Sequence, residues 1–346
     1  MQQPALRDLD QALRNWWSGS HRRPTWRKAG QSEGFVIRDL TVTRLNREWA
    51  EVTVPKAGRV KFRLTRAWAD VTSASSARIT CDRAGRWWVS LTTGPPAFQR
   101  RQTGAVVGID RGVANSVATS GGLMFHAPTL TAGEQARFVA LQRRMSRQCK
   151  GSNRRNRTKG SLARPHACLG DRRRDFVEQT TTRLVRGYDL VVVEALNMSG
   201  MARRPKPKPD PDQPGAWLRN GARAKAALNR AISASCWGTL EQRLTHKTLA
   251  SGTSVLVKVD PRDTSRTCAD RGHTAADNRK SQAVFVCQSC GHSAHADTNA
   301  AINILARGVP DHTIPATVGV CGRTDRERTH QPGPASSVQP GTRTAA

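Results

Sequence analysis

Three acidic residues lie at the ends of strongly apolar segments, where a fold can fix carboxylates beside an open edge. Asp110 and Glu194 each end a run of apolar residues, and Asp297 immediately precedes residues 298–307, which are predicted to form a helix. Carboxylates that converge repel one another, and divalent cations relieve that repulsion. Mg²⁺ prefers oxygen ligands and retains waters, so a few carboxylates and a phosphate suffice to bind it. Two such ions can activate a water and stabilise the leaving oxygen of a phosphodiester.

Each of these acids also fits an ordinary structural role. Asp297 is a candidate helix N-cap, Glu194 is a candidate surface residue at a strand end, and Asp110 is a candidate turn former before Gly112. Taken singly, no acid distinguishes the two interpretations. Taken together in a strongly basic chain, the three favour one shared two-metal Mg²⁺ site.

Three cysteines form a second candidate metal site within two matching segments. Residues 268–273 (Cys-Ala-Asp-Arg-Gly-His) parallel residues 287–292 (Cys-Gln-Ser-Cys-Gly-His). The candidate thiolate ligands are Cys268, Cys287 and Cys290. A structural zinc site takes four ligands, typically from two C-x-x-C pairs, and Arg271 stands where the fourth cysteine belongs. Arginine stays charged and cannot ligate a metal.

Zinc binding is therefore left open by the sequence. A histidine could supply the fourth ligand, the candidates being His273, His292 and His295. Zinc could instead bind weakly through three thiolates and a water, or the site could be empty and its hairpin loose. Because Asp297 follows closely, a loose hairpin would also misplace a candidate catalytic acid.

The chain is strongly basic, with 56 Lys and Arg against 26 Asp and Glu in 346 residues and a formal net charge of +30. Such a protein repels itself unless a polyanion neutralises it. Between Arg137 and Asp175 there are 13 basic residues against 2 Asp, a balance that a solvated helix pair does not explain. We therefore predict nucleic-acid binding through phosphate contacts. The candidate residues are Arg143, Arg144, Arg147, Lys150, Arg154, Arg155, Arg157, Lys159, Arg172, Arg173 and Arg174.

Residues 1–100 are predicted to form a helix followed by a small antiparallel β-barrel or sheet. Apolar residues recur at helical spacing in residues 8–17, and alternating segments separated by turn signals fill residues 34–93. Trp87 and Trp88 could stack on bases. Because they are neighbours on one predicted strand, we expect at least one of them to face the core.

Strands and helices alternate in the rest of the chain, which predicts an α/β fold. The predicted strands are residues 105–110, 116–119, 123–125, 189–194 and 254–259. The predicted helices are the two ends of residues 131–187, broken at residues 151–153, then residues 224–250 and 298–307. Pro-rich residues 203–215 are interpreted as a mobile loop, and residues 309–346 as a disordered tail.

Several of these segments, in their order along the chain, carry a family resemblance. Residues 108–113 (Gly-Ile-Asp-Arg-Gly-Val) and 192–197 (Val-Val-Glu-Ala-Leu-Asn) are similar to the first two RuvC motifs of the TnpB family of transposon-encoded RNA-guided endonucleases. Residues 263–268 and 287–292 resemble its zinc ribbon, and residues 295–301 its third RuvC motif. The resemblance covers residues 5–308, and the ordered set is far more specific than any one motif.

The resemblance implies an RNase H-like (RuvC) nuclease that cleaves double-stranded DNA with Mg²⁺, guided by an RNA from the transposon end. Asp110, Glu194 and Asp297 match the three catalytic acids of the family. The implied domains are residues 1–100 (a helix and wedge-like β-barrel, expected to be truncated at the start), residues 101–308 (nuclease, with the basic helical segment 131–187 and a zinc-ribbon-like insert 264–295) and the tail 309–346.

Other functions remain open beside an active nuclease. The arginine at the fourth ligand position and the short start favour a relative that binds RNA and DNA without cutting. A strand-joining transposase lacks a nucleophile other than the single Tyr188, and a Holliday-junction resolvase would lack the N-terminal β region and the ribbon. With no signal peptide and no apolar run of membrane-spanning length, we expect a cytoplasmic prokaryotic protein.

Overall fold

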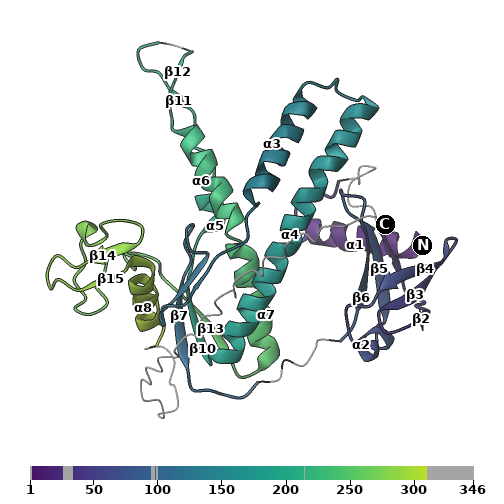
Figure 1. Cartoon of the computed structure of the whole chain (residues 1–346), viewed down its shortest axis with the longest axis horizontal. Helices are drawn as coiled ribbons and strands as arrows, with labels where there is room; N and C mark the ends of the chain where they lie inside the picture. Colours follow the sequence, from purple (N-terminus) through teal and green to yellow (C-terminus); the bar gives the residue numbers. More distant parts are fainter. Residues whose placement is uncertain (1, 26–33, 95–97, 99, 214, 310–346) are drawn as a thin grey trace, which may run out of the picture. The chain divides into compact units, whose positions relative to one another are not determined.

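The computed structural model describes residues 2–25, 34–94, 98, 100–213 and 215–309. The predicted tail beyond Val309 lies outside the described residues. No helix within those ranges is long and apolar enough to cross a membrane. Figure 1 shows the order of the helices and strands along the chain.

The N-terminal region contains a helix and two small antiparallel sheets. Helix α1 (Gln2–Trp17) precedes strands β1 (Gly34–Ile37), β2 (Val42–Arg44), β3 (Trp49–Val54), β4 (Gly58–Arg63), β5 (Ser76–Cys81) and β6 (Trp87–Thr92). The sheets have the orders β1-β5-β6 and β2-β3-β4. Their inward residues form one apolar core, led by Ile37, Val52, Val54 and Ile79. A short helix, α2 (Trp68–Thr72), was not predicted.

The expectation that Trp87 or Trp88 faces the core is wrong. Trp87 is 65% exposed and Trp88 is 42% exposed. The core of this region is filled by small and branched side chains, and the strand that carries both tryptophans has no buried residue. Trp88 instead lies at a polar surface, where its indole N–H donates to Asp82 at 3.2 Å.

A five-stranded mixed sheet forms the centre of the C-terminal region. Its order is β13 (Val255–Val259), β10 (Leu190–Glu194), β7 (Val106–Asp110), β8 (Val117–Thr119) and β9 (Met124–Phe125). Strand β10 runs parallel to both β7 and β13, whereas β7, β8 and β9 form an antiparallel meander. Strand β10 is buried along its whole length, as expected for a parallel strand covered on both faces.

Helices cover both faces of this sheet, and strand alternation decides which residue meets which helix. Val107, Ile109, Val191 and Val193 pack in one apolar cluster with residues of α4 (Asn153–Gly187) and α7 (Trp237–Ser251). The intervening residue Val192 packs on the opposite face with Ile304 of α8 (Ala296–Gly308).

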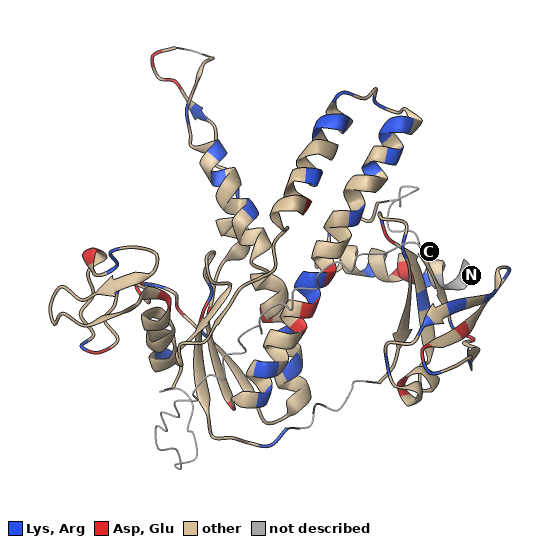
Figure 2. Ribbon diagram, in the orientation of Figure 1, with Lys and Arg blue, Asp and Glu red and all other residues tan. Residues whose placement is uncertain are grey.

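The basic segment folds as two helices, α3 (Ala132–Ser146) and α4, as predicted. The turn between them contains Gly151 in the left-handed region (φ 88°). Ser152 then caps α4 by accepting from the amide of Arg155 at 3.2 Å. Figure 2 shows Lys and Arg along both helices near this turn.

Two predictions between β10 and β13 are corrected. The single helix expected over residues 224–250 is two helices, α6 (Ala222–Ala234) and α7, because Cys236 adopts φ 61° and interrupts the backbone. The Pro-rich loop contains a short hairpin of β11 (Lys208–Pro209) and β12 (Trp217–Leu218). It follows the short helix α5 (Met198–Met201).

The cysteine segment folds before α8. It contains the 3₁₀ helix η1 (Ala276–Asn278) and a hairpin of β14 (Val284–Val286) and β15 (Ser293–His295). Helix α8 begins at Ala296, two residues before the predicted start, so Asp297 lies inside its first turn.

Candidate functional site

The register of β7 and β10, together with the alternation of side chains along each strand, places two of the predicted acids on the same face at the same edge of the sheet. Val192 pairs with Gly108 in parallel register, and Val193 pairs with Ile109. Asp110 and Glu194 are the next residues on their strands, so they lie side by side at the carboxyl ends. By the two-residue period they share the face of Gly108 and Val192, which is the face covered by α8.

Gly108 lets α8 approach the sheet closely enough to bring in the third acid. A Cβ at Gly108 would lie 2.1 Å from the carbonyl oxygen of Ala301 and 2.7 Å from the amide nitrogen of Leu305. Only glycine fits against the helix backbone there. The same helix carries Asp297 in its first turn, beside the ends of β7 and β10.

The three carboxylates interact through space. Burial, followed by the negative charges of Glu194 and Asp297, raises the pKa of Asp110 to about 7. Burial also raises the pKa of Glu194, against a hydrogen bond from Thr264 and nearby arginine charges. Among the described residues, only the cysteine trio has three ligand atoms within 4.8 Å of one another. The acids are therefore interacting neighbours rather than a closed ligand cage.

The ordinary structural roles do not account for these acids. Glu194 is 7% exposed, so it is not a surface residue. Asp297 is 3% exposed and is not the N-cap of α8, because His295 holds that position and its ring accepts from the amide of Asp297 at 3.2 Å. Asp110 ends β7 opposite Ala118 and is half-buried.

Three polar residues that the sequence reasoning missed hold the acids in place. Thr264 donates its hydroxyl to Glu194 at 2.7 Å. Asn115 donates to one carboxylate oxygen of Asp297 at 2.8 Å, and Arg279 donates to the other at 3.0 Å. Thr264 and Arg279 are close in sequence to the cysteine motifs, but nothing in the spacing identifies their partners.

A buried arginine connects the strands and the helix next to the three acids. The side chain of Arg111 is fully buried and forms an ion pair with Glu241 of α7 at 2.7 Å. Its other terminal nitrogen donates to the backbone carbonyl of Glu194. Glu241 also pairs with Lys258 of β13. This chain of charges joins β7, β10, β13 and α7 next to the acids.

The cysteines form a compact thiol group. The sulfur atoms of Cys268, Cys287 and Cys290 lie within 4.8 Å of one another, and the first and last are 3.8 Å apart. Cys268 and Cys287 are buried, whereas Cys290 is exposed. Such a group offers three soft ligands to a zinc ion.

The two cysteine segments have the same backbone geometry, although one lacks a cysteine. The amide of Cys268 donates to the carbonyl of His273 at 2.9 Å, and that of Cys287 donates to the carbonyl of His292 at 2.9 Å. Gly272 and the equivalent Gly291 both have φ 73°. The first turn thus keeps the shape of a metal-binding knuckle without its second thiol.

The residue at the fourth position points away from the thiols. The Arg271 side chain is 72% exposed and pairs with Asp270 at 3.4 Å. None of the candidate histidines belongs to the ligand group within the described part of the chain. His295 is committed to capping α8, and His273 is exposed.

Side chains of α8 hydrogen-bond to the first knuckle. Asn303 donates to the carbonyls of Thr264 and Thr267 at 2.9 and 2.7 Å. Asn299 donates to the carbonyl of Thr267 at 2.8 Å and accepts from the amide of Ala269 at 3.0 Å. The first knuckle is thus tied directly to the helix that carries Asp297.

The predicted basic residues divide into two groups. Four have structural partners: Arg155 closes the α3–α4 turn onto Met145 and Gln148, Arg172 pairs with Glu134, Arg173 donates to Pro128, and Arg174 pairs with Asp171. The other seven are exposed, with no ion pair recorded to a described residue: Arg143, Arg144, Arg147, Lys150, Arg154, Arg157 and Lys159.

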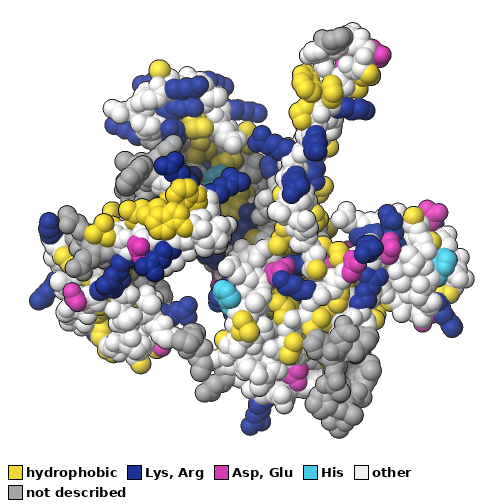
Figure 3. Space-filling view, turned by 180° about the vertical axis from the view of Figure 1, so that it is seen from behind, with side chains coloured by type: hydrophobic (Ala, Val, Ile, Leu, Met, Phe, Trp, Pro, Cys, Tyr) yellow, Lys and Arg dark blue, Asp and Glu magenta, His cyan; other side chains and the backbone are white. Residues whose placement is uncertain are grey.

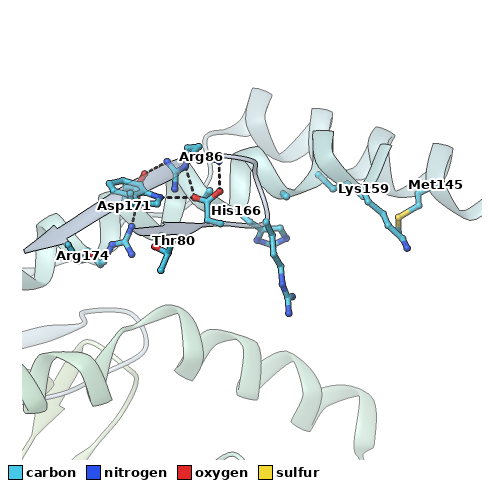
Figure 4. Close-up of a pocket in the computed structure, with 15 residues that line it drawn as sticks. Thr80, Arg86, Met145, Lys159, His166, Asp171 and Arg174 are labelled. Carbon is cyan, nitrogen blue, oxygen red and sulfur yellow. Dashed lines mark hydrogen bonds and ion pairs between the residues drawn. The ribbon is translucent and has the colours of Figure 1, made fainter. Parts of the chain in front are cut away.

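A groove of about 1320 Å³ runs between α4 and the β5–β6 surface. Figure 4 shows Arg86, Asp171 and Arg174 close together at one end of this groove, with Lys159 and Met145 at the other. The guanidinium of Arg86 donates to Asp171 at 2.5 Å and lies 4.9 Å from the ring centroid of Trp88. Cations over an exposed indole make a surface suited to both phosphates and bases.

Comparisons with known proteins agree with these features. The family model for OrfB_IS605, a probable transposase, matches residues 91–204, and that for the Cas12f1-like TNB domain matches residues 237–304. Relatives named as RNA-guided DNA endonucleases occur in Escherichia coli K12 and Streptomyces pristinaespiralis. The first, InsQ, is 34% identical over 307 residues, which cover 88% of this chain and 73% of the relative. The second is 29% identical over 308 residues, which cover 89% and 71%.

A solved structure of a Cas12f1–sgRNA–target DNA complex is similar over 84% of this chain and 67% of that chain, with 14% identity and a TM-score of 0.48. The sequence match to InsQ extends along most of both chains and includes the segments that carry the three acids. The chain belongs to the TnpB family, whose relatives are named as RNA-guided DNA endonucleases.

Proposed function

We propose that this chain is an RNA-guided, Mg²⁺-dependent DNA endonuclease in which Asp110, Glu194 and Asp297 hold the metal ions. The sheet order and the parallel placement of β10 support an RNase H-like nuclease core. The cysteine segment would be its zinc-ribbon-like insert. The guide is an RNA from the transposon end, and the target is double-stranded DNA.

One observation carries the assignment: three acids, brought from distant parts of the chain, interact electrostatically at a single sheet edge. Their mutual repulsion is the kind of strain that a hard divalent cation relieves, and all three donors are oxygens. Bound Mg²⁺ would supply an activated water and stabilise the leaving oxygen of the phosphodiester. The chain itself fixes the carboxylates, through Thr264 on Glu194 and Asn115 on Asp297.

The exposed cations of α3 and α4 are proposed to bind the RNA. Arg143, Arg144, Arg147 and Arg154 line one recess near the helical turn. Cations without internal partners are free to exchange counterions for phosphates. The four arginines of this region that have hydrogen-bond or ion-pair partners within the protein are proposed to position the helices rather than to bind RNA.

The test is cleavage of matched double-stranded DNA by the purified chain with its native flanking-element RNA and Mg²⁺. Asp110→Ala is expected to abolish cutting while RNA affinity stays unchanged. Asp260→Asn is the matched control, because Asp260 follows the neighbouring strand β13 but is exposed and paired with Arg262 at 2.9 Å. Equal cutting by wild type and Asp110→Ala would refute the assignment.

A second candidate, nucleic-acid binding without cleavage, is favoured by the partners of Asp297. Both of its carboxylate oxygens are already engaged, one by Asn115 and the other by Arg279. A chain in which Arg279 permanently holds this oxygen would bind RNA and DNA but would not cut. Tight RNA binding with no Mg²⁺-dependent cutting, in wild type and Asp110→Ala alike, is the result that this candidate predicts.

For the cysteine group we propose weak zinc binding through three thiolates and a solvent ligand. The converging sulfurs support this, and the outward direction of Arg271 leaves the fourth side open. Metal analysis of protein purified without chelator tests it. Stoichiometric zinc that survives mild chelation would contradict the open fourth position, and metal-free protein would contradict binding.

A further inference from the structure

The Pro-rich segment after β10 presents an exposed tryptophan away from the apolar core. Strands β11 and β12 pair antiparallel, with Pro209 opposite Trp217. Trp217 is 66% exposed and the neighbouring Leu218 is 37% exposed. Figure 1 shows this hairpin beyond the end of α6. We call residues 202–213 and 215–223 the hairpin arm.

The base of the hairpin arm is fixed to α6 and to the chain that leaves the acid edge. Asn220 donates to the carbonyl of Lys206 at 2.9 Å, and Asn229 of α6 donates to the carbonyl of Ala202 at 2.8 Å. Lys225 donates to the carbonyl of Met201 at 2.6 Å. These bonds and the prolines restrict the backbone that carries Trp217, so a ligand loses less free energy in ordering the arm.

The hairpin arm is basic as well as aromatic. Its exposed cations outnumber its two acids, Asp210 and Asp212, and are Arg203, Arg204, Lys206, Lys208, Arg219 and Arg223. Figure 3 shows apolar and basic side chains side by side on the projecting segment. An aromatic ring among cations is the combination that binds nucleic-acid strands through stacking and phosphate contacts.

We propose that the hairpin arm is a binding site for single-stranded nucleic acid, with Trp217 stacked on an unpaired base. Bases within a duplex are already stacked on one another, so only a single strand offers a free base face to the ring. A protein partner is disfavoured. The apolar surface of Trp217 and Leu218 is small compared with the roughly 800 Å² that each side of a stable protein interface buries. The strand could be RNA or unpaired DNA.

The arm begins directly after the last residue of α5, which itself starts four residues after Glu194. A short, hydrogen-bonded segment of the chain therefore connects the arm to the sheet edge that carries the acids. A nucleic-acid strand bound to the arm would lie close to that edge along the chain. The site thus deepens the proposed function by adding a contact for the unpaired strand, and its role in cutting rests on that proposal.

The test compares affinities for labelled oligo(dT), oligo(rU) and a duplex of equal length by fluorescence anisotropy at fixed salt. The protein carries Asp110→Ala, so that no probe is cut. Adding Trp217→Ala is expected to weaken single-strand binding about tenfold and to leave duplex binding within about twofold. A loss with oligo(dT) alone assigns the site to DNA, a loss with oligo(rU) alone assigns it to RNA, and either supports the proposal.

Two controls make the result specific. Trp217→Phe retains a stacking ring and is expected to keep most of the affinity. Leu228→Ala removes a 45% exposed apolar side chain from neighbouring α6 and is expected to change nothing. Unchanged single-strand affinity in Trp217→Ala, or an equal loss with the duplex, would overturn the arm site. Cutting by Asp110→Ala would overturn the proposed function alone.

Discussion

The acid edge and the cysteine group are both candidate metal sites, but the fold builds them in opposite ways. The acids are held by the core: two end buried parallel strands, and the third lies on a helix packed against Gly108. The thiols lie on two tight turns, and one turn presents Arg271 where a ligand is expected. The first set contains all three of its predicted donors, whereas the second lacks a cysteine at the fourth position.

This difference between the two sites leads to different expectations for the loss of zinc and for the loss of a carboxylate. Asn299 and Asn303 bind the first knuckle to α8 through backbone carbonyls, so we expect the position of Asp297 to depend little on zinc. The acid edge, in contrast, gathers three interacting carboxylates, of which Arg279 pairs with Asp297, and a divalent cation would relieve their mutual repulsion. We therefore expect loss of zinc to be tolerated and loss of one carboxylate not to be.

The largest expected effect separates the two sites directly. Glu194→Gln should lower DNA cleavage by about 10³-fold, because it removes an ionised metal ligand that stabilises the transition state. Cys287→Ser should lower cleavage less than about tenfold, since the first knuckle remains tied to α8 by Asn299 and Asn303. Single-turnover cleavage rates measure both. Equal losses would show that the thiol group supports the acids more than the hydrogen bonds indicate.

The second prediction concerns pH and the metal-free acid edge. The pKa of Asp110 is raised from 3.8 to about 7, so the folded protein binds this proton more tightly than the unfolded chain does. The resulting stability is fully present below about pH 4 and is lost as the pH rises through about 7, by at most about 4 kcal/mol.

Asp110→Asn stays neutral and should lack this loss. Urea unfolding with EDTA between pH 4 and 8 should therefore show the wild type losing stability relative to Asp110→Asn as the pH rises. Parallel pH profiles for the two proteins would mean that Asp110 is ionised in the metal-free state and that the acids are further apart.

The third prediction tests the contact that brings α8 to the sheet. Gly108→Ala places a Cβ against helix backbone, so we expect a loss of about 3 kcal/mol in the free energy of unfolding. Cleavage should fall as Asp297 moves. Gly121→Ala is the control, because a Cβ there meets nothing within 4 Å. An unchanged free energy of unfolding in Gly108→Ala would show that α8 can move away from the sheet without destabilising the fold.

The fourth prediction, with a smaller expected effect, concerns adding the missing fourth ligand to the cysteine group. Arg271→Cys adds a thiol to a turn that already matches its partner knuckle, so zinc affinity should rise by about tenfold or more. Arg271→Ser, which removes the charge without adding a ligand, should leave affinity unchanged. Competition with a chromogenic chelator measures the affinities. No gain from the added cysteine would mean that the two turns face apart in solution.

The smallest effect concerns cations with and without partners. Arg157→Gln should lower the salt slope of RNA binding by about one, because each lost phosphate contact releases one counterion fewer. Arg172→Gln should change the slope less, since Arg172 is already paired with Glu134. Affinities measured across a salt series decide between the two. Identical slopes would remove the distinction between the free and the partnered arginines.

Much of this fold was predictable, because its strands are short apolar runs bounded by turns. The acids at 110 and 194 could be assigned to strand ends for the same reason. The break at Cys236 could not, because neither glycine nor proline marks that left-handed residue. Thr264 and Asn115 were missed since each contacts an acid 70 or 182 residues away, and only tertiary packing defines such pairs.

The close packing at Gly108 also limits how the acid edge can respond to an ion. Helix α8 has no room to slide toward β7, because its carbonyl at Ala301 already faces a residue without a side chain. We therefore expect the proposed metal binding to involve side-chain rotation, in which the guanidinium of Arg279 leaves Asp297 while the backbone stays in place. The rate of metal uptake would then report on one rotating arginine rather than on the opening of a domain.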